Sequence, residues 1–155
     1  MYESVLAVVE DESMGAPSTT SVSFVRVGSD KAQYDLFFTD RRIVAATVFS
    51  QSDISDIGPV AVYQSGFKWK KIRQENRESF KGKTPDEILK LHNDSYEIPY
   101  GQIKSVKIKK GLRSAKLKME VFWQGALETV DLKIPKKQID EVKNILQTHV
   151  SGSVE

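Results

Sequence analysis

Residues that could catalyse a reaction are few in this chain of 155 residues. Its two histidines, His92 and His149, fall in segments of helical composition, and neither has a second strong metal ligand at a suitable spacing. Gly82-Lys83-Thr84 matches the end of a phosphate-binding loop, but that loop also needs a glycine where Arg77 stands. We therefore expect no catalytic residue, no metal site, no cofactor and no small-molecule substrate.

Charge is distributed unevenly along the chain. Residues 1–62 hold nine acids and four bases, whereas residues 63–155 hold twelve acids and nineteen bases. Such asymmetry suggests an anionic partner for the second half, and an unevenly charged solvated surface is the alternative. The sequence contains no cysteine and no apolar run long enough to span a bilayer. We expect a cytoplasmic protein, with contact at the membrane periphery left open.

The first basic cluster surrounds Trp69. It consists of Lys68, Lys70, Lys71, Arg73, Arg77, Lys81 and Lys83. On a helix, Trp69, Ile72 and Phe80 share one stripe, with the bases around it. One interpretation is an interfacial helix that contacts anionic lipid or nucleic acid. The other is a stripe that packs onto the domain while the bases are solvated.

The second basic cluster contains seven bases with no acid between them. Its members are Lys104, Lys107, Lys109, Lys110, Arg113, Lys116 and Lys118. Alternation places Lys107 and Lys109 on a solvent face, with Lys116 and Lys118 on the partner strand. This face would attract phosphates, or it would protect a sheet edge against pairing with another chain. Binding of single-stranded nucleic acid is the weaker interpretation, because only Phe122 is placed for stacking.

The elements that would position these clusters are mostly strands. Apolar residues predict a hairpin from 34–38 and 43–49, and the near-continuous hydrophobicity of the second strand predicts cover on both faces. Thr39, Asp40 and Arg41 fit the chemistry of the hairpin turn better than any binding site. Strands over 104–109, 116–123 and 130–134 predict an antiparallel meander. An amphipathic helix begins after Pro135.

Residues 50–95 have a different character. Residues 64–80 have the composition of a helix, and Thr84-Pro85 resembles an N-cap followed by proline at the first helical position. This second, short helix is expected to end near Asn93. We therefore predict a helical insertion at about 50–95 that interrupts the strands.

Two segments carry a resemblance to a known family. Residues 34–44, YDLFFTDRRIV, and residues 96–106, YEIPYGQIKSV, resemble two motifs of bacterial and archaeal pleckstrin-homology-like (GRAM-like) domains. The resemblance implies a mainly β α+β fold, an antiparallel barrel of two orthogonal sheets capped by a C-terminal helix. It implies one domain over 1–150, and we expect a frayed tail at 151–155.

The same resemblance implies a scaffold for binding and no reaction. The first loop, residues 10–20, holds three acids and no base, which argues against the inositide site of many relatives. The expected function is a non-catalytic binding or adaptor module that contacts anionic membrane lipid or a protein through the basic insertion. The alternatives are a nucleic-acid-binding domain that uses the 104–118 face, or a self-assembling structural protein that forms a homo-oligomer.

Overall fold

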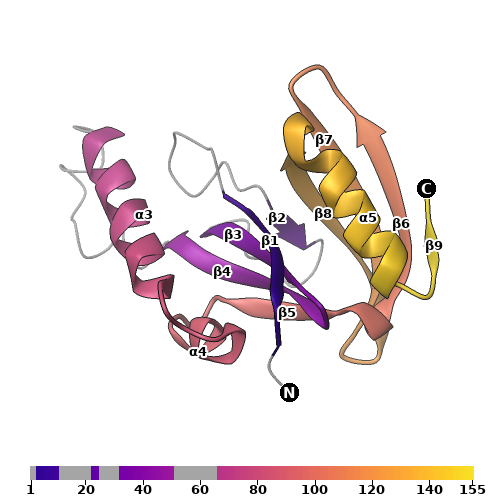
Figure 1. The fold of residues 1–155 in the computed structure, drawn as a ribbon, viewed down its shortest axis with the longest axis horizontal. Coiled ribbons are helices and arrows are strands. Elements are labelled where there is room, and N and C mark those ends of the chain that lie inside the picture. Colours follow the sequence, from indigo (N-terminus) through magenta and orange to yellow (C-terminus); the bar gives the residue numbers. More distant parts are fainter. Residues whose placement is uncertain (1–2, 11–21, 25–31, 51–65) are drawn as a thin grey trace.

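The computed structural model describes residues 3–10, 22–24, 32–50 and 66–155. Its strands form two sheets (Figure 1). The first has the order β1-β3-β4-β5, with bounds Val5–Val9, Ala32–Thr39, Arg42–Ser50 and Tyr96–Pro99. The second has the order β2-β8-β7-β6-β9, with bounds Val22–Phe24, Ala126–Pro135, Ser114–Trp123, Ile103–Lys110 and Ser153–Val154. The predicted mainly β α+β class is confirmed.

Two helices follow β4, and a third follows β8. Their bounds are Gly66–Phe80 for α3, Pro85–Lys90 for α4 and Ile139–His149 for α5, with 3-10 turns η2 at Tyr100–Gln102 and η3 at Lys136–Gln138. None of these helices is long and apolar enough to cross a membrane. α3 and α4 fall inside the insertion predicted at 50–95, of which residues 51–65 lie outside the described part.

The predicted hairpin is formed by β3 and β4, and Thr39 organises its turn. The Thr39 hydroxyl accepts hydrogen bonds from the amides of Arg41 and Arg42, at 3.1 and 3.0 Å. The same hydroxyl donates to Glu3 Oε2 at 2.6 Å. Asp40 receives the amide of Ser4 on its Oδ1 at 3.2 Å. These bonds confirm that the motif serves the turn and tie the start of the chain to it.

The predicted meander is also present. In β7 the residues alternate between buried and exposed: Ala115, Leu117, Met119 and Val121 are buried, and the residues between them face outward. β6 and β8 pair with β7 in antiparallel register on its two sides. The turn from β7 to β8 uses positive φ at Gln124 (49°) and Gly125 (82°), which suits a two-residue hairpin loop.

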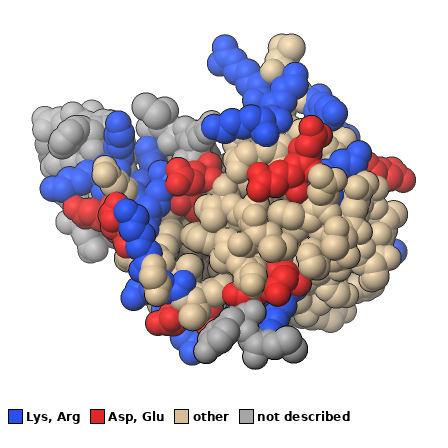
Figure 2. Space-filling model, in the orientation of Figure 1, with Lys and Arg blue, Asp and Glu red and all other residues tan. Residues whose placement is uncertain are grey.

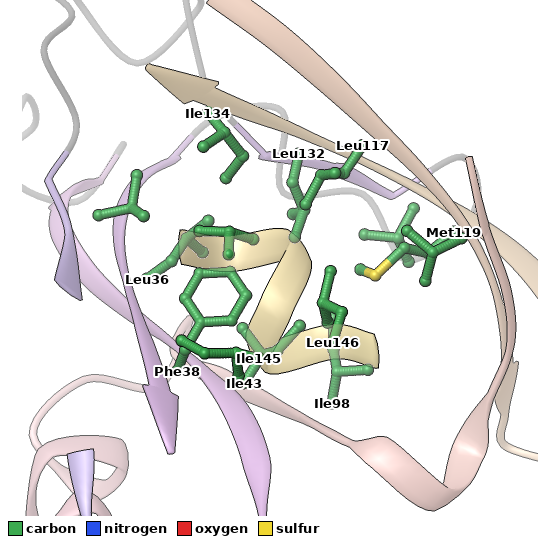
Figure 3. Packing of buried hydrophobic residues seen from close by; sticks show 14 of the residues in the cluster. Leu36, Phe38, Ile43, Ile98, Leu117, Met119, Leu132, Ile134, Ile145 and Leu146 are labelled. Atoms are coloured by element: carbon green, nitrogen blue, oxygen red, sulfur yellow. The ribbon is translucent and has the colours of Figure 1, made fainter. Parts of the chain in front are cut away.

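The main core lies between the two sheets and α5 (Figure 3). Ile145 and Leu146 of α5 point toward side chains of both sheets, among them Phe38 and Leu132. Leu146 and Leu132 are fully buried. The helical stripe predicted after Pro135 is therefore the surface that closes this core.

A second apolar cluster covers the other face of the first sheet. Val44, Ala46 and Val48 of β4 contact Phe80 of α3 and Ile88 of α4. Figure 1 shows both helices on the side of this sheet away from α5. Because β4 is covered on both faces, every residue from 43 to 49 is buried, as its continuous hydrophobicity predicted.

Helix α4 begins with a capping box. The amide of Glu87 donates to Thr84 Oγ1 at 3.2 Å, and the amide of Thr84 donates to Glu87 Oε1 at 3.0 Å. Pro85 occupies the first helical position. The predicted N-cap is confirmed, although the helix ends at Lys90 and not near Asn93.

The C-terminal residues correct one expectation. Instead of a frayed tail at 151–155, Ser153–Val154 forms β9, which pairs with β6 in parallel. The amide of Ile108 donates to the Glu155 carbonyl at 3.0 Å, and the amide of Glu155 donates to the Val106 carbonyl at 2.9 Å. β9 covers the β6 edge of the second sheet through backbone hydrogen bonds. Because such bonds do not depend on side-chain type, the hydrophobic pattern of the sequence did not predict this strand.

Candidate functional site

The lysines of the second basic cluster lie in direct opposition on the outer face of the second sheet. Lys107 is the register partner of Lys118, and Lys109 is the partner of Lys116. Lys116 is in turn the partner of Lys133 on β8. All five side chains are exposed. Like charges in directly opposite positions destabilise a sheet, so this arrangement is not explained by the stability of the fold.

The turn between β6 and β7 carries an apolar residue at its apex. Leu112 is 97% exposed, and its exposed neighbours include Lys110 and Arg113. The turn is held by a bond from the Gly111 amide to the Ser114 carbonyl at 2.9 Å. A side chain at Gly111 would place its Cβ 2.9 Å from that same carbonyl oxygen, so the close approach requires glycine.

Two further lysines reach the same end of the molecule from η3. Ser114 is the register partner of Pro135, so Lys136 and Lys137 follow immediately beside the turn. Both are exposed. We call this surface the basic end, which comprises Lys109, Lys110, Arg113, Lys116, Lys133, Lys136 and Lys137. Figure 2 shows the blue side chains gathered there, at the top of the view, where Figure 1 places the β6–β7 turn.

Carboxylates on this sheet face lie farther from the turn. Asp131 is the register partner of Lys118, about 14 Å along β7 from Ser114 at the usual rise per residue. Its Oδ2 lies 3.5 Å from Lys116 Nζ and partly offsets that charge. On α5 the first turn contains Asp140 and Glu141, which follow the lysines of η3 in sequence. Positive charge therefore dominates at the turn and declines away from it.

Lys133, Lys136 and Lys137 were not among the predicted site residues. They lie outside the run of bases from 104 to 118, and sequence proximity alone does not connect them with it. The signal was present in the predicted meander, because pairing 116–123 with 130–134 brings the end of the third strand back to the first turn. The β7–β8 turn fixes the register of these two strands, and this register brings Lys133, Lys136 and Lys137 close to the β6–β7 turn.

The first basic cluster agrees in part with the second of its two interpretations, because Phe80 packs onto β4 while Lys70 and Lys71 are exposed, but two of its arginines are placed as neither interpretation expected. Arg73 is buried, with 4% of its surface exposed, and its Nη1 donates to Gln33 Oε1 at 2.7 Å. Arg77 Nε and Nη2 donate to the two carboxylate oxygens of Asp35, at 2.7 and 2.9 Å. Asp35 is itself buried. Both arginines therefore fasten α3 to β3 and do not belong to an exposed basic surface.

Other bases of that cluster remain at the surface. Lys70 and Lys71 are exposed, and Lys71 Nζ lies 4.0 Å from Glu75 in the next helical turn. The side chains of Lys68 and Trp69 lie outside the described residues. Over α3, Figure 2 shows blue and red intermixed, unlike the basic end. The described side chains of α3 therefore present mixed charge and not the basic face that the first of the two interpretations required.

The two histidines considered for catalysis each contact a neighbouring residue of the fold. The His149 ring stacks on Tyr100, with centroids 5.4 Å apart, and His92 Nδ1 accepts the amide of Asp94 at 3.2 Å. Burial raises the pKa of Tyr100, whose hydroxyl donates to the carbonyl of Thr39 at 2.7 Å. In the described part of the chain, no group of three or more histidine, aspartate or glutamate residues is placed to hold a metal ion.

Two depressions flank β1 on the side of α5. One, of about 300 Å³, is lined by Leu6, Glu141, Asn144, Ile145, Thr148 and His149. The other, of about 380 Å³, is lined by Val8, Glu10, Lys137 and Gln138. Gln138 Nε2 donates to the Val8 carbonyl at 2.9 Å, which closes part of this edge. Each wall contains one carboxylate, Glu141 in the first and Glu10 in the second, where it lies beside Lys137 of the basic end.

Comparison with known proteins gives no relative. No protein-family model matches the chain, and no curated protein or solved structure matches it. The feature that distinguishes the described surface is the basic end, which combines opposed lysines with an exposed leucine.

Proposed function

We propose that the chain is a non-catalytic binding or adaptor module built on a pleckstrin-homology-like (GRAM-like) scaffold. Support comes from the order of its elements: β1-β3-β4-β5, then the meander β6-β7-β8, then α5 packed between the sheets. In this proposal the two sheets form an orthogonal antiparallel barrel, α5 caps it, and α3 and α4 are an insertion. We place the module in the cytoplasm, the location that the cysteine-free sequence favours.

The proposed role of the module is to hold an anionic partner on the basic end. The observation that carries this proposal is the direct opposition of Lys109 to Lys116 and of Lys116 to Lys133. Bases that face bases repel one another in the free protein. A partner rich in phosphate or carboxylate groups would relieve that repulsion and gain charge-assisted hydrogen bonds. Binding should therefore also stabilise the fold.

This proposal moves the binding surface away from the insertion. The sequence pointed to Lys70, Lys71, Arg73 and Arg77, but both arginines are engaged by β3. The two exposed lysines of α3 now serve as a control, because they allow the same charge change at a distant surface.

Heparin, used as a generic polyanion, provides the test. The Lys110→Glu, Arg113→Glu double variant changes the charge beside the turn, and the Lys70→Glu, Lys71→Glu double variant makes the same change on α3. We expect the wild type to bind heparin with an affinity that falls steeply as salt rises. The turn variant should reduce the slope of log affinity against log salt by about two, and the α3 variant should leave it unchanged.

Two results would contradict the proposal. The first is the absence of heparin binding by the wild type even at low salt. The second is an equal loss of affinity in the α3 variant and the turn variant, because a non-specific response to net charge would produce that result. Both substituted pairs are exposed, so circular dichroism spectra should match the wild type and exclude misfolding as the cause.

A further inference from the structure

The β6–β7 turn has two chemical layers. Its apex is Leu112, which is 97% exposed. Behind the apex come Lys110 and Arg113, and then the opposed pair Lys109 and Lys116. At the usual rise of a strand this pair lies within about 10 Å of the apex, a distance comparable to the Debye length at about 0.1 M salt. An anionic surface that touches the apex therefore interacts with all four bases.

A single exposed leucine needs no explanation by itself. The significant feature is the place of Leu112 at the apex of a turn that a backbone bond and the tight approach of Gly111 hold in shape. The side chain is thus presented outward on a defined turn. This arrangement leaves an apolar group at the point that first meets any partner.

The two layers match the two layers of a membrane surface. Anionic headgroups attract basic residues at the interface, and the boundary with the acyl chains accepts an apolar side chain. A nucleic acid supplies phosphates but offers no apolar phase for Leu112, and an aliphatic side chain cannot stack on a base as an aromatic ring does. The geometry therefore favours a bilayer over a nucleic acid.

We infer that the partner of the basic end is an anionic lipid bilayer, into whose interface Leu112 inserts while the surrounding bases bind headgroups. This inference rests on the proposed function, because it names the partner of the same surface. It commits to the membrane surface as a whole and needs no pocket for one headgroup.

Vesicle cosedimentation tests the inference directly. Phosphatidylcholine vesicles with about 30 mol% phosphatidylserine should bind the protein at low salt, and vesicles of phosphatidylcholine alone should not. Leu112→Ser should weaken binding by about tenfold or more, the loss expected when a leucine is no longer buried. Neutralising Lys110 and Arg113 to glutamine should weaken it by about 25-fold, at about fivefold per base.

Matched controls are available on the same chain. Leu127 is 45% exposed beside the β7–β8 turn, at the other end of β7, so Leu127→Ser removes a surface leucine far from the basic end. Lys70→Gln with Lys71→Gln removes two bases from α3. Both control variants should bind anionic vesicles as the wild type does.

Insertion can be measured at the residue itself. Because the chain contains no cysteine, Leu112→Cys and Leu127→Cys each provide one unique site for an environment-sensitive dye. The dye at position 112 should shift its emission to the blue on anionic vesicles. The dye at position 127 should not change.

The outcomes separate this inference from the proposed function. Binding to heparin or to an oligonucleotide without binding to anionic vesicles would overturn the bilayer and leave the proposed function in place. Vesicle binding that is unaffected by Leu112→Ser, with no dye shift at position 112, would overturn docking through the turn. A protein that binds neither vesicles nor polyanions would overturn both.

Discussion

Arg42 offers the sharpest test of how the insertion and the start of the chain are held to the first sheet. Its guanidinium donates twice to Glu3, from Nη2 to Oε1 at 2.8 Å and from Nε to Oε2 at 3.0 Å. Nη2 also donates to Asp86 Oδ1 at 2.6 Å, and Nη1 donates to Glu97. Of these three carboxylates only Glu3 is as buried as Arg42, since its side chain is 9% exposed and that of Arg42 is 14% exposed. Asp86 is 72% exposed, so solvent screens its contribution.

The expected effect of Arg42→Met follows from that difference. The substitution leaves the Glu3 carboxylate in its nearly buried site with the hydroxyl of Thr39 as its remaining described partner. Removing one member of a buried ion pair costs about 3–5 kcal/mol, and the residual exposure of Glu3 favours the lower value, about 3 kcal/mol. The surface pairs add little to this figure.

Urea denaturation measures the effect. With a slope of about 2 kcal/mol/M, a loss of about 3 kcal/mol lowers the midpoint by about 1.5 M. Arg41→Met is the control, because Arg41 is the exposed neighbour in the same turn and its loss should move the midpoint little. Combining Arg42→Met with Glu3→Gln should show a coupling of about 2 kcal/mol in a double-mutant cycle. Equal midpoints for the Arg41 and Arg42 variants, or no coupling, would refute this reasoning.

Three other substitutions probe separate parts of the fold. Gly152→Ala should detach β9, because its Cβ would lie 2.0 Å from the Lys104 carbonyl oxygen, and hydrogen exchange at the Ile108 amide should accelerate while the urea midpoint changes little. The amide and hydroxyl of Thr84 hold the pKa of Glu87 below its ordinary value. The ionised carboxylate therefore stabilises the fold at neutral pH, and this stabilisation is lost on acidification. The urea midpoint of Glu87→Gln should therefore fall less than that of the wild type between about pH 6 and about pH 3. Leu146→Ala should cost about 2–5 kcal/mol, because this side chain is fully buried between the sheets.

Much of the fold could be predicted from local patterns. The β3–β4 hairpin and the β6-β7-β8 meander were evident because period-two alternation and turn residues act between neighbours in sequence. The capping box at Thr84 was equally local. The pairing of β9 with β6 was not predictable, since it depends on backbone bonds and on the absence of a side chain at Gly152. Such contacts leave little trace in composition.

The candidate site was predicted in part. The run from Lys107 to Lys118 was correctly placed on an outward face, but the orientation of Arg73 and Arg77 was not. Their partners, Gln33 and Asp35, are about 40 residues away on β3. A carboxylate inside the apolar segment 34–38 was the available clue, because a buried acid requires a cationic or hydrogen-bonding partner. The long basic helix downstream supplies that partner.

These assignments explain where the positive charge of the second half is available. Arg77, a base of the insertion, is paired with Asp35 of the first half of the chain, whereas the pair of Arg42 with Glu3 lies within the first half. At the basic end the register sets Lys109 against Lys116, and bases face bases. The charge asymmetry along the sequence is therefore not spread evenly over the surface. Arg77 of the second half is neutralised at the first sheet, whereas opposed bases are concentrated at one turn of the second sheet, which is why a partner should be sought at that turn.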